Sequence, residues 1–249
     1  MRLLVSTSNI NCYLALYQSC IKYNIECLRF DDVDVNSIKE DDVVIYLESI
    51  FKSYKTLRCR VINKAYFSEE LMDKYSQYTI IKKSGLNCIP TFTYSEFKNM
   101  KIVVPFIAKP KRGSMGDNIK LLQQNESLDN LNDLYIFQPF VKNDGDWRIV
   151  VVNNRAVSMI KRKGTGFLNN IAKGAMAWSE WDYIAADLAE ECSKYLNAEY
   201  CGIDIMKDKN TGVYYFLESN IAPTFDTSQI LTKIDVSNEI VHYIKRVYS

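Results

Sequence analysis

The sequence contains very little histidine, and this scarcity excludes several kinds of enzyme. The one histidine in 249 residues is His242. It lies in a C-terminal segment whose Ile240, Val241, Ile244 and Val247 recur at helical spacing. A lone histidine on a terminal amphipathic helix indicates a structural role, which argues against zinc hydrolase sites, Ser-His-Asp triads and Cys-His pairs. If the protein is an enzyme, carboxylates, lysines and arginines must carry its chemistry.

Signals for membranes, export and disulfides are also missing. No apolar run approaches the length of about 20 residues that spans a bilayer, and the N-terminus lacks the layout of a signal peptide. The seven cysteines are odd in number and scattered, with no C-x-x-C pair. They predict reduced thiols in a cytoplasmic protein.

The charges balance almost completely, with 31 basic and 30 acidic side chains. Nothing in this composition favours a nucleic-acid or membrane-surface partner. No G-x-G-x-x-G follows the first predicted strand and no G-K-[ST] occurs, which argues against dinucleotide-binding and P-loop folds. An apolar fraction of 47% suits an ordinary globular protein of one or two domains.

The order of predicted elements indicates two parts. Strand-like segments at 2–6, 25–30, 42–47 and 59–63 alternate with helical sequence, which predicts a small parallel α/β unit. An amphipathic helix then begins at a cap signal at Ser68 and stops at Gly85. From about Thr91 the strands are shorter, with a hairpin turn at Asn153 and Asn154 and one long helix at 181–197. We therefore expect a larger α+β part after the first unit.

A lysine and a glycine-rich loop occur together in "FIAKPKRGSMGDNIKLL". Lys109 lies in or at the end of an apolar strand, where a lysine is costly unless it has an anionic partner. Gly113, Ser114 and Gly116 form a tight loop whose backbone N–H groups can turn toward a phosphate chain. The alternative is an ordinary hairpin with a lysine that reaches out to solvent.

The next segment, "YIFQPFVKNDGDWRIVVV", ends an apolar strand at Gln138 and Pro139. Because proline cannot donate to a strand ladder, this is an edge or a strand end. Its free backbone can bind the edge of an adenine, with Asp146 available to a ribose hydroxyl. A plain turn between two strands is the alternative.

A cationic loop follows in "MIKRKGTGFLNNIAKGAMAW", where Lys161, Arg162, Lys163 and Lys173 lie near glycines and paired asparagines. Such a loop can hold phosphate oxygens or a carboxylate. A solvated charged face is the other interpretation.

An acidic hairpin carries the strongest signal. Asp204 lies on one predicted strand and Glu218 and Asn220 on the next, with Glu218 and Asn220 on the same face because they are two residues apart. Hard oxygen ligands suit magnesium bound together with substrate phosphates. Two buried carboxylates would also repel each other without a cation. A capping cluster without a metal remains the alternative.

In this order the segments resemble the ATP-grasp superfamily, and most closely its RimK-type branch of carboxylate–amine (glutamate) ligases. The resemblance covers nearly the whole chain. It is carried by "DKYSQYTIIKKSGLNCIPTF", "AKPKRGSMG", "FQPFV", "GDWRIVVV", "GFLNNIAKGA" and, most specifically, "GIDIM" with "FLESNIAP".

The resemblance implies a mixed α/β and α+β protein, an ATP-grasp fold with a small N-terminal parallel α/β (pre-ATP-grasp) domain. Residues 1–66 would form that domain and 67–249 the ATP-grasp domain. The latter would contain a small lid subdomain at about 91–140 and a C-terminal metal and substrate subdomain at about 141–249.

The resemblance also implies a role for each matching residue, with ATP and two Mg²⁺ ions as cofactors and Mn²⁺ as a substitute metal. Nucleotide binding would involve Lys74, Lys109, Gly113, Ser114, Met115, Gly116, Gln138, Pro139, Phe140, Val141, Asp146 and Asn170. The metal ligands would be Asp204, Glu218 and Asn220. Arg162, with Arg148 or Lys173 behind it, would stabilise the oxyanion of a tetrahedral intermediate.

The implied reaction activates a substrate carboxylate as an acyl phosphate, which an amine or a hydroxyl then attacks. Three positions depart from the family pattern: Pro139 replaces a glutamate, Leu168 a polar residue and Thr224 a glycine. The last two lie toward the acceptor side, so the sequence does not identify the substrates.

Four functions fit these residues. The first is a ligase that joins a small-molecule or peptide carboxylate to an amine on another molecule. The second is a peptide-modifying ligase that closes side-chain esters or amides within one peptide. The others are a phosphotransferase on the same fold and a non-catalytic nucleotide-binding module. A homo-oligomer is compatible with all four, because many relatives are dimers or tetramers.

Overall fold

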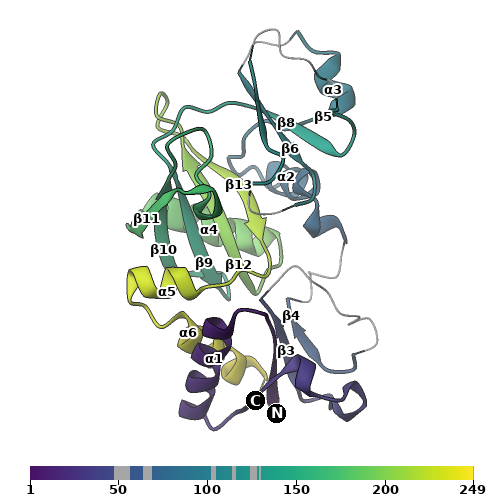
Figure 1. Ribbon diagram of the computed structural model, residues 1–249, viewed down its shortest axis with the longest axis vertical. Helices are drawn as coiled ribbons and strands as arrows, with labels where there is room; N and C mark the ends of the chain where they lie inside the picture. The colour runs from purple at the N-terminus through teal and green to yellow at the C-terminus, as the bar shows by residue number, and fades with distance from the viewer. Residues whose placement is uncertain are drawn as a thin grey trace.

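The computed structural model describes residues 1–47, 57–63, 69–101, 105–113, 116–123, 128 and 130–248. Three sheets follow one another along the molecule (Figure 1). The N-terminal sheet and both chain ends lie at the bottom of this view, a five-stranded sheet lies in the middle, and a small sheet lies at the top.

The N-terminal sheet is parallel throughout, with strand order β2-β1-β3-β4. Its central strands are buried on both faces, which explains their unbroken apolar sequence. The side chain of Asn9 caps α1 by accepting a hydrogen bond from the N–H of Cys12. The elements confirm the predicted strands and helix and are β1 (Arg2–Ser6), α1 (Ile10–Lys22), β2 (Glu26–Arg29), β3 (Val43–Tyr46) and β4 (Arg60–Ile62).

The last helix of the chain, α6 (Val236–Tyr248), returns to this first sheet. It packs beside α1, and its Ile240, Val241 and Ile244 join the core that contains Leu3 and Ile45. His242 stacks on the ring of Tyr23, with ring centroids 6.0 Å apart. The predicted boundaries assign residues 141–249, and with them α6, to the C-terminal subdomain, although α6 packs in the core of the N-terminal sheet. The division into domains stays a prediction.

A short connection leads to α2 (Lys74–Lys83), which lies beside the edge of the five-stranded sheet. Asp73 caps this helix by accepting hydrogen bonds from the N–H groups of Tyr75 and Ser76. The helix ends before Gly85, whose φ of +82° suits a glycine. The expected cap, Ser68, lies outside the described residues, and the α-helix itself begins later, at Lys74.

The small upper sheet is antiparallel, in the order β5-β8-β6-β7. Helix α3 covers it and begins with a capping box between Thr93 and Glu96. Phe97 of this helix stacks on Phe137 of the sheet at 4.1 Å between ring centroids. The elements are β5 (Phe92–Thr93), α3 (Tyr94–Lys98), β6 (Phe106–Pro110), β7 (Lys120–Leu122) and β8 (Tyr135–Pro139).

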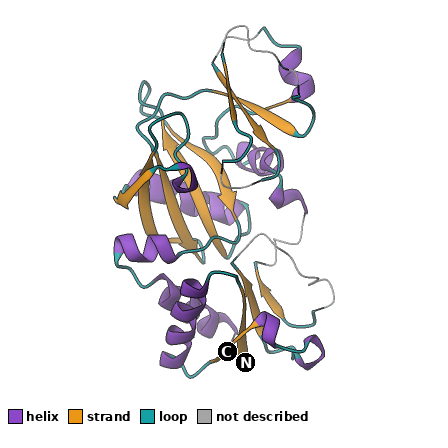
Figure 2. Cartoon of the chain, viewed as in Figure 1, coloured by secondary structure: helices purple, strands orange, loops and turns teal. Residues whose placement is uncertain are grey.

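The middle sheet is antiparallel, in the order β11-β10-β9-β12-β13. The expected hairpin is present, with φ of 50° at Asn153 and 59° at Asn154. Helix α4 packs on one face of the sheet (Figure 2). The elements are β9 (Asp146–Val152), β10 (Arg155–Lys163), β11 (Met176–Ser179), α4 (Tyr183–Tyr195), β12 (Tyr200–Lys207), β13 (Tyr214–Asn220) and α5 (Asp226–Thr232).

The described residues also contain four short 3-10 helices: η1 (Phe30–Asp32), η2 (Val35–Ser37), η4 (Glu69–Met72) and η5 (Ile171–Lys173). Among the helices of the described ranges, none has both the length and the apolar character needed to cross a bilayer.

Candidate active site

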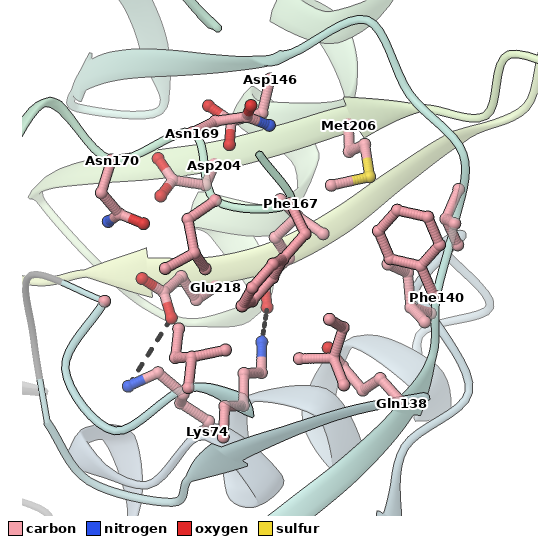
Figure 3. Close-up of a pocket in the computed structure, with 18 of the residues that line it drawn as sticks. Lys74, Gln138, Phe140, Asp146, Phe167, Asn169, Asn170, Asp204, Met206 and Glu218 are labelled. Atoms are coloured by element: carbon pink, nitrogen blue, oxygen red, sulfur yellow. Dashed lines mark hydrogen bonds and ion pairs between the residues drawn. The ribbon is translucent and has the colours of Figure 1, made fainter. Parts of the chain in front are cut away.

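A pocket opens between the small upper sheet and the face of the five-stranded sheet opposite α4 (Figure 3). Most of the predicted site residues line it, although they come from distant parts of the chain. They are Lys74, Lys109, Gly113, Gly116, Gln138, Pro139, Phe140, Val141, Asp146, Arg162, Asn170, Asp204 and Glu218.

Five predicted residues are not among these. Arg148 and Asn220 lie beside the pocket without lining it, and Lys173 lies at the surface. Ser114 and Met115 lie outside the described residues.

One half of the pocket is apolar. Ile89, Ile107, Met206 and Leu217 line it together with Phe140 at the end of β8. In Figure 3, Phe140 and Met206 lie on the side of Gln138, away from the acidic residues. A slot of this kind suits a flat aromatic ring, which gains from apolar contact on both faces.

The apolar residues were missed by the sequence analysis because each is also ordinary core sequence. A signal was nevertheless present. Met206 is two residues after Asp204 on β12, and Ile107 is two before Lys109 on β6. Alternate residues of a strand point to one face, so a polar site residue implicates its neighbours at this spacing.

Gln138 is buried, and its Nε2 donates to the hydroxyl of Thr91 at 2.7 Å. Its side chain therefore joins β8 to the segment before β5. The backbone of residues 139–141 borders the pocket beside it.

Two lysines surround Glu218 at the other half of the pocket. Nζ of Lys74 lies 3.6 Å from Oε2 of Glu218 and donates to the carbonyl of Gly113 at 2.7 Å. Nζ of Lys109 donates to the carbonyl of Leu217 at 3.4 Å. Both lysines line the pocket beside Glu218, and positive charge at such a place suits an anionic ligand.

Burial and charge act in opposite directions on these groups. Burial lowers the pKa of Lys109 to about 8, although Glu218 opposes that shift. Burial alone would raise the pKa of Glu218, but the charges of Lys74 and Lys109 hold it below its usual value. At neutral pH Glu218 is therefore a carboxylate between two cations.

A chain of ion pairs crosses the floor of the pocket. Nη2 of Arg162 lies 2.6 Å from Oδ1 of Asp146 and 2.9 Å from Oδ2 of Asp204. Nε of Arg148 lies 2.6 Å from Oδ1 of Asp204. These side chains share a face because the residue pairs Asp204–Arg148 and Arg162–Asp146 are directly opposite on neighbouring strands.

Asp146 has a protein partner in the pocket, and the expectation that it binds a ribose hydroxyl stays a prediction. It lines the pocket but is paired with Arg162, which donates to it from Nε at 2.7 Å. Burial raises its pKa to about 6, against the opposing charge of Arg162. In this structure Asp146 therefore orients Arg162.

The acidic hairpin places Asp204 directly opposite Glu218, with Asn220 opposite Gly202. The amide oxygen of Asn220 accepts a hydrogen bond from the N–H of Ala222 at 3.1 Å. A Cβ at Gly202 would lie 2.9 Å from Nη1 of Arg148, so the glycine lets that guanidinium pack closely against β12.

The donor set fits a magnesium ion. Asp204 and Glu218 offer carboxylate oxygens to the same cavity. Oδ1 of Asp204 is buried and accepts no hydrogen bond from the described residues, although Arg148 is in contact with it. An under-satisfied carboxylate oxygen beside a second carboxylate is what a hard cation requires.

The loop after β10 closes the pocket on its remaining side. Phe167, Leu168 and Asn169 line the pocket with Asn170. A Cβ at Gly116, where φ is +73°, would lie 2.9 Å from Oδ1 of Asn170, so the glycine loop approaches this asparagine closely.

Lys173 does not reach the pocket with them. Its Nζ pairs with Asp117 at 2.6 Å, and both side chains are exposed. Lys173 therefore links the loop after β10 to the glycine-rich segment.

Fold and site together define a nucleotide-dependent enzyme of the ATP-grasp type. A family model for the RimK-like ATP-grasp domain matches residues 71–244. The chain belongs to this family, as the sequence predicted.

Known proteins agree with this assignment. The chain is 21% identical to a probable alpha-L-glutamate ligase of Marinomonas sp. (strain MWYL1), over 95% of this chain and 84% of that protein. Its fold is similar to that of the ATP-grasp ligase PsnB complexed with minimal precursor, with a TM-score of 0.73, 14% identity and 98% of both chains covered. It is also similar to the macrocyclase MdnC bound with precursor peptide MdnA from Microcystis aeruginosa MRC, with a TM-score of 0.72 and 13% identity, covering 99% of this chain and 100% of that one. The predicted ATP-grasp fold is confirmed.

Proposed function

We propose that the protein is an ATP- and Mg²⁺-dependent ligase that activates a substrate carboxylate and joins it to an amine. The observation that carries this proposal is that Asp204 and Glu218 lie directly opposite each other on neighbouring strands. Both line a pocket whose other half is apolar. Membership of the RimK-like ATP-grasp family supports it, as does the name of the glutamate ligase relative.

Each part of the pocket has a role in this proposal. The apolar half, with Met206 and Leu217, would hold the adenine. Lys74 and Lys109 would bind the phosphates, as point charges that approach from the upper sheet and α2. Gly113 and Gly116, which line the pocket, would lie against these phosphates.

Asp204, Glu218 and Asn220 would hold magnesium, and the ATP-grasp ligase PsnB has been solved with Mg and ADP. Bound Mg²⁺ would neutralise the phosphates while the γ-phosphoryl group is transferred. We propose two ions, with Mn²⁺ able to replace them, which these oxygen ligands would hold together with substrate phosphates and water.

Arg162 would stabilise the negative charge that develops on the substrate. Burial opposes its charge, but Asp146 and Asp204 raise its pKa, so it stays a cation. With Asp146 orienting it, its guanidinium would bind the substrate carboxylate during attack on the γ-phosphorus. It would then bind the oxyanion that forms when the amine attacks the acyl phosphate. This intermediate collapses as phosphate leaves. Arg148 would support it through Asp204.

A second candidate is a ligase that modifies a peptide, closing side-chain esters or amides. Its support is the likeness in fold to PsnB and MdnC, which were solved with precursor peptides. The chemistry is the same in both cases, and only the acceptor differs.

Trapping the acyl phosphate tests the ligase proposal. The protein would be incubated with Mg-ATP, hydroxylamine and pooled carboxylates that include acidic peptides, and hydroxamates would be identified by mass spectrometry. We expect a hydroxamate and ADP from the wild type and from Glu239→Gln, an exposed control on α6. We expect neither from Glu218→Gln. ADP with a phosphorylated product that hydroxylamine does not convert would show a phosphotransferase and contradict the proposal.

A further inference from the structure

A buried carboxamide outside the pocket binds the strand that carries the proposed metal ligands. Gln77 lies on α2 and is 3% exposed. Its Nε2 donates to the carbonyl of Ser219 at 2.9 Å, and its Oε1 accepts from the N–H of Ser219 at 2.8 Å. Ser219 stands between Glu218 and Asn220, so both peptide groups of this residue are held by one side chain.

Gln77 binds the edge of β13 as a neighbouring strand would. β13 is the edge strand of the five-stranded sheet, with β12 as its neighbour in the sheet. A buried edge leaves backbone donors and acceptors that must find partners. A carboxamide offers the same donor and acceptor as a peptide group and satisfies both. Its second N–H donates to the carbonyl of Leu71 at 2.7 Å, so the carboxamide is itself fixed.

A second buried carboxamide holds the same strand end from the other side. Asn63 follows β4 and is 1% exposed. Its Nδ2 donates to the carbonyl of Ile221 at 2.7 Å, and its Oδ1 accepts from the N–H of Tyr200 at 2.7 Å. The hydroxyl of Tyr200 donates to the carbonyl of Pro223 at 2.7 Å. The two neighbours of Asn220 in the chain, Ser219 and Ile221, therefore each have backbone groups hydrogen-bonded to a buried carboxamide.

Gln77 also couples this strand to the phosphate side of the pocket. Lys74 and Gln77 are three residues apart on α2 and so lie on one side of the helix. Gln77 holds the backbone next to Glu218, while Lys74 lies 3.6 Å from the Glu218 carboxylate. The position of the lysine relative to the carboxylate thus depends on the contact between Gln77 and Ser219.

We propose that Gln77 is a positioning residue that sets the orientation of Glu218 and Asn220 for metal binding. This inference rests on the proposed function, because that function assigns the metal to these residues. Partners that orient metal ligands typically change metal affinity by about 10- to 100-fold when they are replaced. A purely structural contact would change stability and leave metal affinity alone.

The test replaces Gln77 by methionine, which has similar length and no hydrogen-bonding amide. Gln229→Met is the matched control, because Oε1 of Gln229 accepts from the N–H of Ser237 at 3.2 Å between α5 and α6. The affinity for Mn²⁺ would be measured by electron paramagnetic resonance at saturating ADP, and the affinity for ADP alone would be measured in EDTA. Melting temperatures would be recorded for both variants.

We expect the Kd for Mn²⁺ to rise about tenfold in Gln77→Met and less than about twofold in Gln229→Met. The Kd for ADP in EDTA would change less than about twofold in both, because the apolar half of the pocket is untouched. Gln77→Asn keeps the amide but withdraws it from Ser219, and we expect a smaller rise in the same direction. This second variant keeps the test valid if Gln77→Met does not fold.

Amide hydrogen exchange in residues 217–222 distinguishes results that would contradict this inference from results that would contradict the proposed function. Faster exchange in Gln77→Met with an unchanged Kd for Mn²⁺ would show a contact that serves stability only and would overturn this inference alone. A wild type that binds ADP but no Mn²⁺ would overturn the proposed function, and the inference with it.

Discussion

Two buried ion-pair clusters in this protein have the same chemistry and different surroundings. In the N-terminal sheet, Asp42 pairs with Arg2 at 2.6 Å. On the pocket floor, Asp204 pairs with Arg148 and Arg162. Asp42 and Asp204 are almost fully buried, at 1% and 3% exposed. Burial and ion pairing by themselves therefore do not distinguish a structural carboxylate from a functional one.

The difference lies in what each carboxylate faces. Asp42 accepts hydrogen bonds from the side chain and N–H of Arg2 and from the N–H of Lys39. Asp204 is held by ion pairs with Arg148 and Arg162, but it lines a cavity and has the Glu218 carboxylate directly opposite on the neighbouring strand. A buried carboxylate that lines a cavity beside a second carboxylate indicates a ligand, whereas one enclosed by protein donors indicates stability.

The largest effect is expected at Arg162, which links both carboxylates of the pocket floor. Arg162→Lys keeps the charge but loses the planar fork that binds two carboxylates, so kcat should fall by about 10²- to 10³-fold. Arg155→Lys, at the exposed start of the same strand, should leave kcat unchanged. Steady-state ADP release measures both variants, and equal activity would remove Arg162 from the reaction.

The reverse pattern is expected for Asp42→Asn. It leaves Arg2 without its anion at a largely buried site, so the free energy of unfolding should fall by about 2–3 kcal/mol with kcat unchanged. Burial opposes the charge of Asp42, but the hydrogen bonds from Arg2 outweigh it and lower the pKa below 3.8. Because the folded pKa is lowered, this stability is present above about pH 4 and lost as the pH falls further. Urea unfolding of both proteins between pH 7 and pH 3 measures it, and a difference that does not shrink at pH 3 would contradict this account.

A smaller effect is expected at Met206, in the apolar half of the pocket. Met206→Ala removes apolar contact from the proposed adenine slot, and we expect the KM for ATP to rise about tenfold with little change in kcat. Met100→Ala, at a position 36% exposed, is the control. A fall in kcat of similar size would show that the slot also orients the reacting atoms.

The smallest effect is expected at Lys173. The pair with Asp117 is exposed, and such pairs contribute about 0.2–1 kcal/mol. Lys173→Met should therefore change kcat by less than about fivefold. A loss as large as that of Arg162→Lys would restore the catalytic role that the sequence suggested for Lys173.

Much of the fold was predictable because local patterns and tertiary packing agree. The apolar centres of the strands predicted at 2–6 and 42–47, residues 3–5 and 43–46, are continuous, as parallel strands buried on two faces require. Asp204 and Glu218 could be placed near each other because a short connection joins their two strands. Their directly opposite positions depend on a register shift beside Asp204, which the sequence does not encode.

The remaining features depend on contacts that local sequence does not encode. Gln77 on an amphipathic helix has the pattern of a solvent-facing residue, yet it is buried against Ser219. Asp146 has a charged partner, Arg162, on the neighbouring strand, and no spacing rule distinguishes that pairing from contact with a ribose. The return of α6 to the first sheet is equally invisible, because an apolar helix face does not specify the surface that it covers.

The central claim is that the charged half of the pocket binds a metal ion together with a nucleotide. Isothermal titration of ADP, with and without Mg²⁺, tests it in the wild type and in Glu218→Gln. We predict that Mg²⁺ tightens ADP binding to the wild type and has no such effect on Glu218→Gln. Equal tightening in both proteins, or no binding of ADP to the wild type, would contradict the claim.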